Sequence, residues 1–91
     1  MPIRLKDNAV AELTARDERL RKPNGKPHHG RIISASGVSQ THWWNIRKGF
    51  KDPGAETIPR LVELAMQTGL TEPEAYDLLF TTEPRTGQPA A

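Results

Sequence analysis

The sequence has no cysteine and no long apolar run. The absence of cysteine excludes disulfides and thiolate metal sites, so the fold must depend on helix packing or on oligomerisation. No apolar stretch approaches the roughly 18 residues that a membrane-spanning helix needs, and residues 1–10 lack the apolar core of a signal peptide. We therefore expect a soluble protein without a membrane partner, located in the cytoplasm. The 91 residues suffice for one small domain.

The charges are divided unevenly along the chain, although the formal net charge is only +2. Residues 1–51 hold eleven Lys or Arg and four Asp or Glu, a net charge of +7. Residues 52–91 hold two Lys or Arg and seven Asp or Glu, a net charge of −5. The division favours a polyanionic partner for the first half. A solvated surface of uneven charge is the alternative interpretation.

Apolar residues that recur at spacings of three and four predict an all-α fold, a compact bundle of five helices. The predicted helices cover residues 8–21, 28–36, 40–48, 57–68 and 72–80. Their apolar stripes form the expected core: Val10, Leu13, Leu20, Ile32, Ile33, Ala35, Trp43, Ile46, Ile58, Leu61, Val62, Ala65, Met66, Ala75, Tyr76, Leu79 and Phe80. Asp7, Thr57 and Thr71 are the expected N-caps of the first, fourth and fifth helices, and Glu74 completes a capping box with Thr71.

No segment alternates with period two for long enough to predict a strand. From Thr81 the composition shifts to Thr, Pro, Gly, Gln and Ala, which is typical of disorder. We therefore expect a domain over residues 1–80 and a disordered tail over residues 81–91. The fifth helix either completes the core or contributes to a dimer.

The second and third helices are separated by Gly37, Val38 and Ser39. Glycine tolerates the left-handed backbone of a tight turn, and Ser39 is placed to cap the next helix. Helical spacing puts Trp43 and Ile46 on the buried side of that helix. The opposite side carries Gln40, Thr41, Trp44, Asn45 and Lys48. This pattern is typical of a helix-turn-helix, in which Gln or Asn forms paired hydrogen bonds with a purine edge.

Residues 8–80 resemble the lambda-repressor-like (Cro/CI, XRE type) DNA-binding domain of five helices. The resemblance rests on Ser36-Gly37-Val38-Ser39, Ile46-Arg47-Lys48-Gly49, Asp52-Pro53 and Glu56-Thr57 at the spacing of that family. The Trp43-Trp44 pair is most similar to phage immunity repressors and Cro-like regulators. The resemblance implies a sequence-specific transcriptional regulator, a repressor of phage or plasmid type. It would bind an operator in double-stranded DNA as a monomer or weak homodimer and associate with the nucleoid of a bacterial host cell.

The resemblance also implies roles for individual residues. Four residues would contact bases: Gln40, Thr41, Trp44 and Asn45. Seven would contact phosphates: His29, Arg31, Ser39, His42, Arg47, Lys48 and Lys51. Lys22 and Lys26 belong either to a solvated turn or to a basic arm that touches DNA. No cofactor, metal or small-molecule substrate is expected, because the histidines lack ligand spacing and no catalytic constellation is present.

Two other functions remain open at this point. An antitoxin-type protein-interaction module shares the same fold, so fold alone cannot separate it from a repressor. An excision or architectural factor would bend the DNA that it binds.

Overall fold

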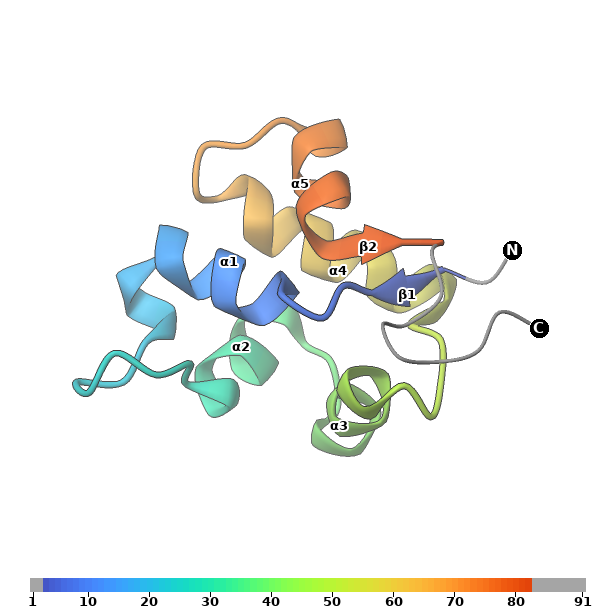
Figure 1. Ribbon diagram of the computed structural model, residues 1–91, viewed down its shortest axis with the longest axis horizontal. Helices are drawn as coiled ribbons and strands as arrows, with labels where there is room; N and C mark the ends of the chain where they lie inside the picture. The colour runs from blue at the N-terminus through green and yellow to red at the C-terminus, as the bar shows by residue number, and fades with distance from the viewer. Residues whose placement is uncertain (1–2, 83–91) are drawn as a thin grey trace.

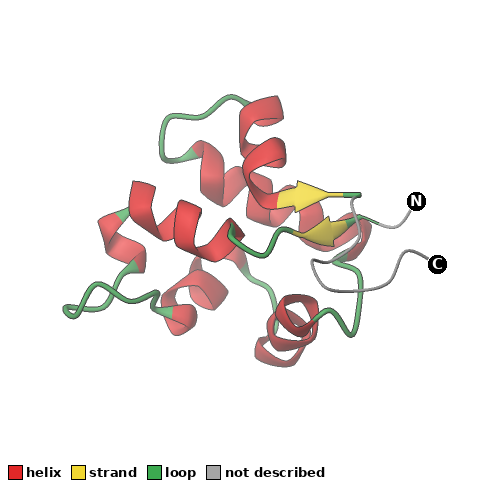
Figure 2. Ribbon diagram, viewed as in Figure 1, coloured by secondary structure: helices red, strands yellow, loops and turns green. Residues whose placement is uncertain are grey.

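Helices form most of residues 3–82, which are the residues that this computed structural model describes (Figure 1). The elements in chain order are β1 (Arg4–Leu5), α1 (Ala9–Arg16), the 3₁₀ helix η1 (Glu18–Leu20), α2 (His29–Ser36), α3 (Gln40–Lys48), α4 (Gly54–Met66), α5 (Glu72–Leu79) and β2 (Phe80–Thr81). Figure 2 shows the two short strands lying side by side among the helices. The expected all-α architecture is therefore confirmed, with the addition of a small sheet.

The first helix is shorter than predicted, because the chain turns at Asp17. Asp17 has extended backbone (φ −135°), and its carboxylate accepts a hydrogen bond from the backbone N–H of Arg19 at 3.0 Å. The Arg19 guanidinium donates two more bonds to the same carboxylate, at 3.0 and 2.8 Å. Asp17 therefore ends α1 and caps η1. The predicted cap at Asp7 is also wrong, because Asn8 occupies the N-cap position and Asp7 pairs with Arg4.

Helices α2 and α3 end at Ser36 and Lys48, as predicted, whereas α4 begins earlier than expected, at Gly54. Thr57 is therefore not an N-cap: it lies in the first turn of α4 and is buried. Pro59 lies inside the helix and has no N–H to donate to the carbonyl of Ala55. Because Ala55 is exposed, water can satisfy that carbonyl. The helix continues past the proline to Met66.

The start of α5 matches the prediction in detail. The Thr71 hydroxyl accepts a hydrogen bond from the Glu74 backbone N–H, and the Glu74 carboxylate accepts one from the Thr71 backbone N–H. Both halves of the capping box are therefore present. The predicted end at residue 80 is one residue too late, because Phe80 has extended backbone (φ −124°, ψ 153°) and its side chain is buried.

The two strands were not expected from the sequence. β1 and β2 pair antiparallel, with Leu5 opposite Phe80 and Arg4 opposite Thr81. The domain therefore extends beyond residue 80, and Thr81 is part of the sheet instead of a disordered tail. The remainder of the predicted tail from residue 83 onward lies outside the described residues.

The core joins all five α-helices and both strands. It comprises Leu5, Ala9, Leu13, Leu20, Ile32, Val38, Trp43, Ile46, Leu61, Val62, Leu64, Ala65, Ala75, Leu79 and Phe80. Two expected core residues, Ala35 and Met66, are instead exposed. Ser36 is buried beside Ala35, and its hydroxyl donates to the Ile32 carbonyl at 2.7 Å, which makes a polar residue tolerable there. Helix α4 packs against both α5 and α2, so the core fixes the position of the α2–α3 pair.

Candidate nucleic-acid interface

Three residues connect α2 to α3, and Gly37 and Ser39 have the roles that the sequence predicts. Gly37 has φ +74°, a backbone conformation that side chains disfavour, and its N–H bonds to the Ile33 carbonyl. Val38 is 5% exposed and packs in the core. The Ser39 hydroxyl accepts a hydrogen bond from the His42 backbone N–H at 3.1 Å and so caps α3. The tight turn holds α3 at the edge of the core.

Helix α3 has one buried side and one exposed side. Trp43 and Ile46 are 2% and 1% exposed, so they attach α3 to the core as predicted. The opposite side, here called the α3 face, comprises the exposed Gln40, Thr41, Trp44 and Lys48 and the half-buried Asn45. The structure therefore brings together the four residues predicted to contact bases, although Asn45 lies at the margin of the face.

Trp44 is a large aromatic residue in the middle of the α3 face, and its side chain is 52% exposed. The Lys48 ammonium lies 4.7 Å from the centre of the Trp44 ring, and the Arg47 guanidinium lies 5.4 Å from it. Both distances are within the range of cation–π attraction. These contacts hold the indole along the helix and place two positive charges beside it, a combination suited to contact with a polyanion.

His29 has a structural contact that the sequence did not reveal. The Trp43 indole N–H donates to His29 Nδ1 at 3.2 Å, so the imidazole is neutral with its proton on Nε2. Burial lowers the pKa of His29 below its usual value, and the positive charges of Arg47, Lys22 and His28 lower it further. His29 therefore links α2 to α3, and its predicted phosphate contact would have to be made by a neutral ring.

Three further residues predicted to contact phosphate have partners within the domain. The Arg31 guanidinium donates to the Arg19 carbonyl at 3.0 Å. The Ser39 hydroxyl is the cap of α3. His42 Nε2 lies 3.0 Å from the carbonyl of Pro53, so this ring joins α3 to the start of α4. These contacts position the side chains near the α3 face, and their contact with phosphate stays a prediction.

The segment predicted to be a solvated turn or a basic arm is an ordered hairpin. Arg21 and Pro27 form an antiparallel bridge, and the Lys22 backbone N–H donates to the Lys26 carbonyl at 2.7 Å. Lys22 and Lys26 are both exposed. Figure 1 shows this hairpin projecting from the lower left of the domain, beside α2. A short arm of fixed shape therefore carries two positive charges.

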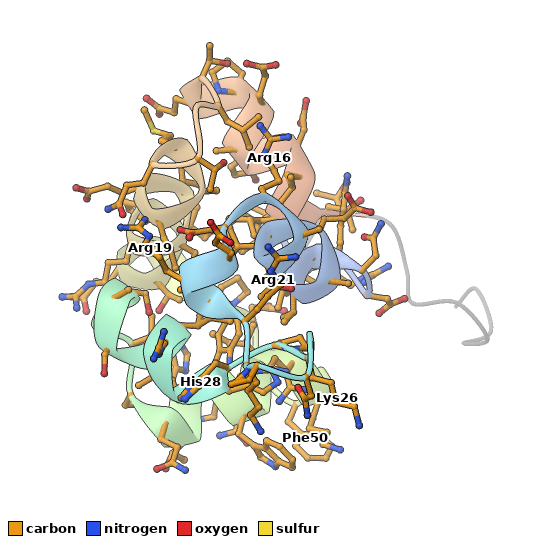
Figure 3. All side chains as sticks on the ribbon, turned by 90° about the vertical axis from the view of Figure 1, so that its left-hand side faces the viewer. Arg16, Arg19, Arg21, Lys26, His28 and Phe50 are labelled. Atoms are coloured by element: carbon orange, nitrogen blue, oxygen red, sulfur yellow. The ribbon has the colours of Figure 1, made fainter. Side chains whose placement is uncertain are left out.

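Helix α5, which carries the acidic residues Glu72, Glu74 and Asp77, lies at the opposite end of the domain from α3. Figure 1 places α3 at the bottom of the molecule and α5 at the top. Figure 3 shares its vertical axis and shows Lys26, His28 and Phe50 in the lower part, with Arg16 in the upper part. Helices α4 and α5 carry one basic residue, Arg60, against five acidic residues: Glu56, Glu63, Glu72, Glu74 and Asp77. A polyanion that approached the α3 face would be remote from the acidic residues of α5.

Two residues near the interface were missed by reasoning from the sequence. Arg60 extends from α4 to donate to the Gly37 carbonyl at 3.0 Å, so it adds a positive charge beside the turn. Phe50 is 75% exposed just after α3. The contact of Arg60 is non-local and has no sequence signal, whereas the exposure of Phe50 has a local cause described below.

The described residues contain neither a membrane-spanning helix nor a cluster of metal ligands. Within residues 3–82, no helix has the length and apolar character needed to cross a membrane. In the same part of the chain, no three His, Cys, Asp or Glu side chains are grouped as ligands for a metal ion. No protein-family model, curated protein or solved structure matches the chain.

Proposed function

We propose that this protein binds duplex DNA in a sequence-specific manner and represses transcription by occupying an operator. In this proposal α2 and α3 form a helix-turn-helix, and α3 lies in the major groove. The observation that carries the proposal is the two-sided character of α3. Trp43 and Ile46 attach one side to the core, while the other side presents amide, hydroxyl, aromatic and cationic groups to solvent.

The α3 face has the chemistry needed to distinguish base pairs. The amide of Gln40 or Asn45 has a donor and an acceptor that match the N6 and N7 atoms of adenine. Trp44 supplies an apolar surface for a thymine methyl group or a sugar. Each well-made paired contact contributes about 1–3 kcal/mol of discrimination against the wrong base. The few residues of this face would therefore suffice for a sequence preference.

The surrounding cations would hold the phosphate backbone. Lys48 and Lys51 lie at and just beyond the end of α3, and Lys22 and Lys26 lie on the ordered hairpin. Arg31 and Arg47 are two further cations that the resemblance predicts to contact phosphate. If all six contact phosphates, the affinity should fall with salt at a log–log slope of about 5. Between about 50 and 200 mM salt, that slope lowers the affinity by roughly a thousandfold.

The decisive experiment is selection of bound duplexes from a random DNA library, followed by binding measurements at several salt concentrations. We expect one enriched sequence and the steep salt dependence given above. A palindrome with half-sites about 10 base pairs apart would indicate dimeric binding. An affinity independent of salt, or the absence of any enriched sequence, would refute the proposal. Co-purification of a stable protein partner in place of DNA binding would instead support an antitoxin-type module.

Single substitutions separate base reading from phosphate contact. Gln40→Ala should cost about 1–3 kcal/mol on the selected sequence and relax the preference at one position. Its matched control is Gln67→Ala, an exposed glutamine beyond the end of α4. Lys48→Ala should weaken all sequences equally and reduce the salt slope by about 1. Arg16→Ala makes the same change in charge at the other end of the domain and should leave the slope unchanged.

A further inference from the structure

Phe50 is the most exposed of the large apolar residues in the described part of the chain. Its exposed fraction is 75%, compared with 52% for Trp44 and 38% for Met66. The Trp44 ring lies under two cations, whereas within residues 3–82 the Phe50 ring contacts no other aromatic ring and no cation. A single exposed apolar residue is common on protein surfaces, so the significance of Phe50 depends on the groups that surround it.

The cause of this exposure lies in the end of α3. Gly49 adopts a left-handed conformation (φ +81°), and its N–H bonds to the Ile46 carbonyl at 3.2 Å. The Phe50 N–H then bonds to the Asn45 carbonyl at 2.9 Å. In such helix ends the residue at position 50 frequently packs against an apolar side chain at position 45 or 44. Here position 45 holds the polar Asn45, and within residues 3–82 no ring contact joins Phe50 to Trp44, so the backbone is fixed while the ring stays exposed.

The charges around Phe50 favour a nucleic acid as the covering molecule. Arg47, Lys48 and Lys51 flank it within four residues, and Asp52 is the nearest acidic residue in the sequence. Figure 3 shows Phe50 at the lower end of the molecule, with Lys26 of the hairpin above it in this view. Because Phe50 lies between these cations in the sequence, its ring would come close to the DNA whenever they bind phosphate.

We infer that Phe50 inserts between adjacent base pairs and bends the DNA. This inference rests on the proposed function, because it concerns how the same site treats duplex DNA. Proteins that bind the minor groove use phenylalanine, among other apolar side chains, to partly unstack a base step and kink the duplex by about 20–90°. Phe50 would act in the same way beside α3. Pyrimidine–purine steps such as TA and CA unstack most easily, so Phe50 should select one of them at the edge of the binding site.

The test measures bending by circular-permutation gels and by energy transfer between dyes at the ends of the selected duplex. The wild-type protein should bend the DNA, and Phe50→Ala should abolish the bend and weaken binding about tenfold. Phe50→Leu should retain most of the bend, because leucine also acts as a wedge. Met66→Ala removes an exposed apolar residue from α4 and is the control. Because Phe50 is so exposed, circular dichroism should show an intact fold in every variant.

The outcomes distinguish this inference from the proposed function. A duplex that is bound but straight, or a bend that survives Phe50→Ala, overturns the wedge and leaves DNA binding intact. A change in self-association by sedimentation, without a change in bending, would assign Phe50 to a protein contact and also overturn it. Failure of the wild-type protein to bind any duplex refutes the proposed function and the wedge together.

Discussion

The hydrogen bond between Trp43 and His29 is the contact whose loss should most directly loosen α3. His29→Ala removes the acceptor and leaves the indole N–H of a side chain that is 2% exposed without a partner. A buried polar group deprived of its partner costs about 1–3 kcal/mol. In a domain of this size each kcal/mol lowers the melting temperature by about 4–8 °C. We therefore expect thermal denaturation, followed by circular dichroism, to show a decrease of at least about 4 °C.

His29→Asn is the matched rescue variant, because the amide oxygen of asparagine occupies nearly the same position as Nδ1 and accepts a hydrogen bond. It should recover most of the stability that alanine loses. If His29→Asn has the melting temperature of His29→Ala and not that of the wild type, the acceptor atom is not the source of the stability. If His29→Ala has the same melting temperature as the wild type, the hydrogen bond contributes nothing to stability.

The same pair predicts how stability depends on pH. The pKa of His29 is lowered in the folded protein, chiefly by burial, so the unfolded chain takes up the proton more readily. Stability should therefore be complete above the unfolded pKa of about 6.5 and should fall as the pH decreases toward the folded pKa. Melting at about pH 7.5 and about pH 5 should show this loss in the wild type and a smaller loss in His29→Asn. An equal loss in both proteins would assign the titration to another group.

Three further predictions concern the elements that position the interface. Gly37→Ala should cost about 1–2 kcal/mol in urea denaturation, because the left-handed backbone disfavours a Cβ atom; unchanged stability would contradict the role of the turn. Ser39→Ala should cost about 0.5–2 kcal/mol in the same assay by removing the cap of α3. Hydrogen bonds from Arg19 lower the pKa of Asp17. The stability that the ionised carboxylate contributes should therefore be complete above about pH 4 and be lost as the pH falls through the folded pKa. Arg19→Ala should reduce that acid-dependent loss, and an identical acid titration by tryptophan fluorescence would refute the interpretation.

Features with a local signal were predictable from the sequence. Gly37, Ser39, Thr71 and Glu74 act within a few residues of themselves, through backbone conformation or capping, and the structure confirms all four. The two sides of α3 followed from helical periodicity, because Trp43 and Ile46 recur at a spacing of three. The positions of the candidate base-reading residues on α3 were therefore predictable, although their function is still a proposal.

Features that depend on distant partners were not predictable. The strands have two residues each and join segments more than 70 residues apart, so no periodicity in the sequence predicts them. The end of α1 depends on hydrogen bonds between Asp17 and Arg19, two residues that also fit a continuous helix. The acceptor role of His29 requires Trp43 to lie across the turn between two helices. The exposure of Phe50 had a partial local signal, since Asn45, one of the two positions that such a residue packs against, is polar.

The pairing of β1 with β2 has a consequence for engineering. Because Arg4 lies opposite Thr81, the two ends of the described chain emerge side by side, on the right of Figure 1. A short linker between them permits circular permutation, with new ends in the turn over residues 67–70 that joins α4 to α5. Figure 1 places that turn at the top, so a permuted chain, or one inserted into a loop of a host protein, would leave the α3 face uncovered.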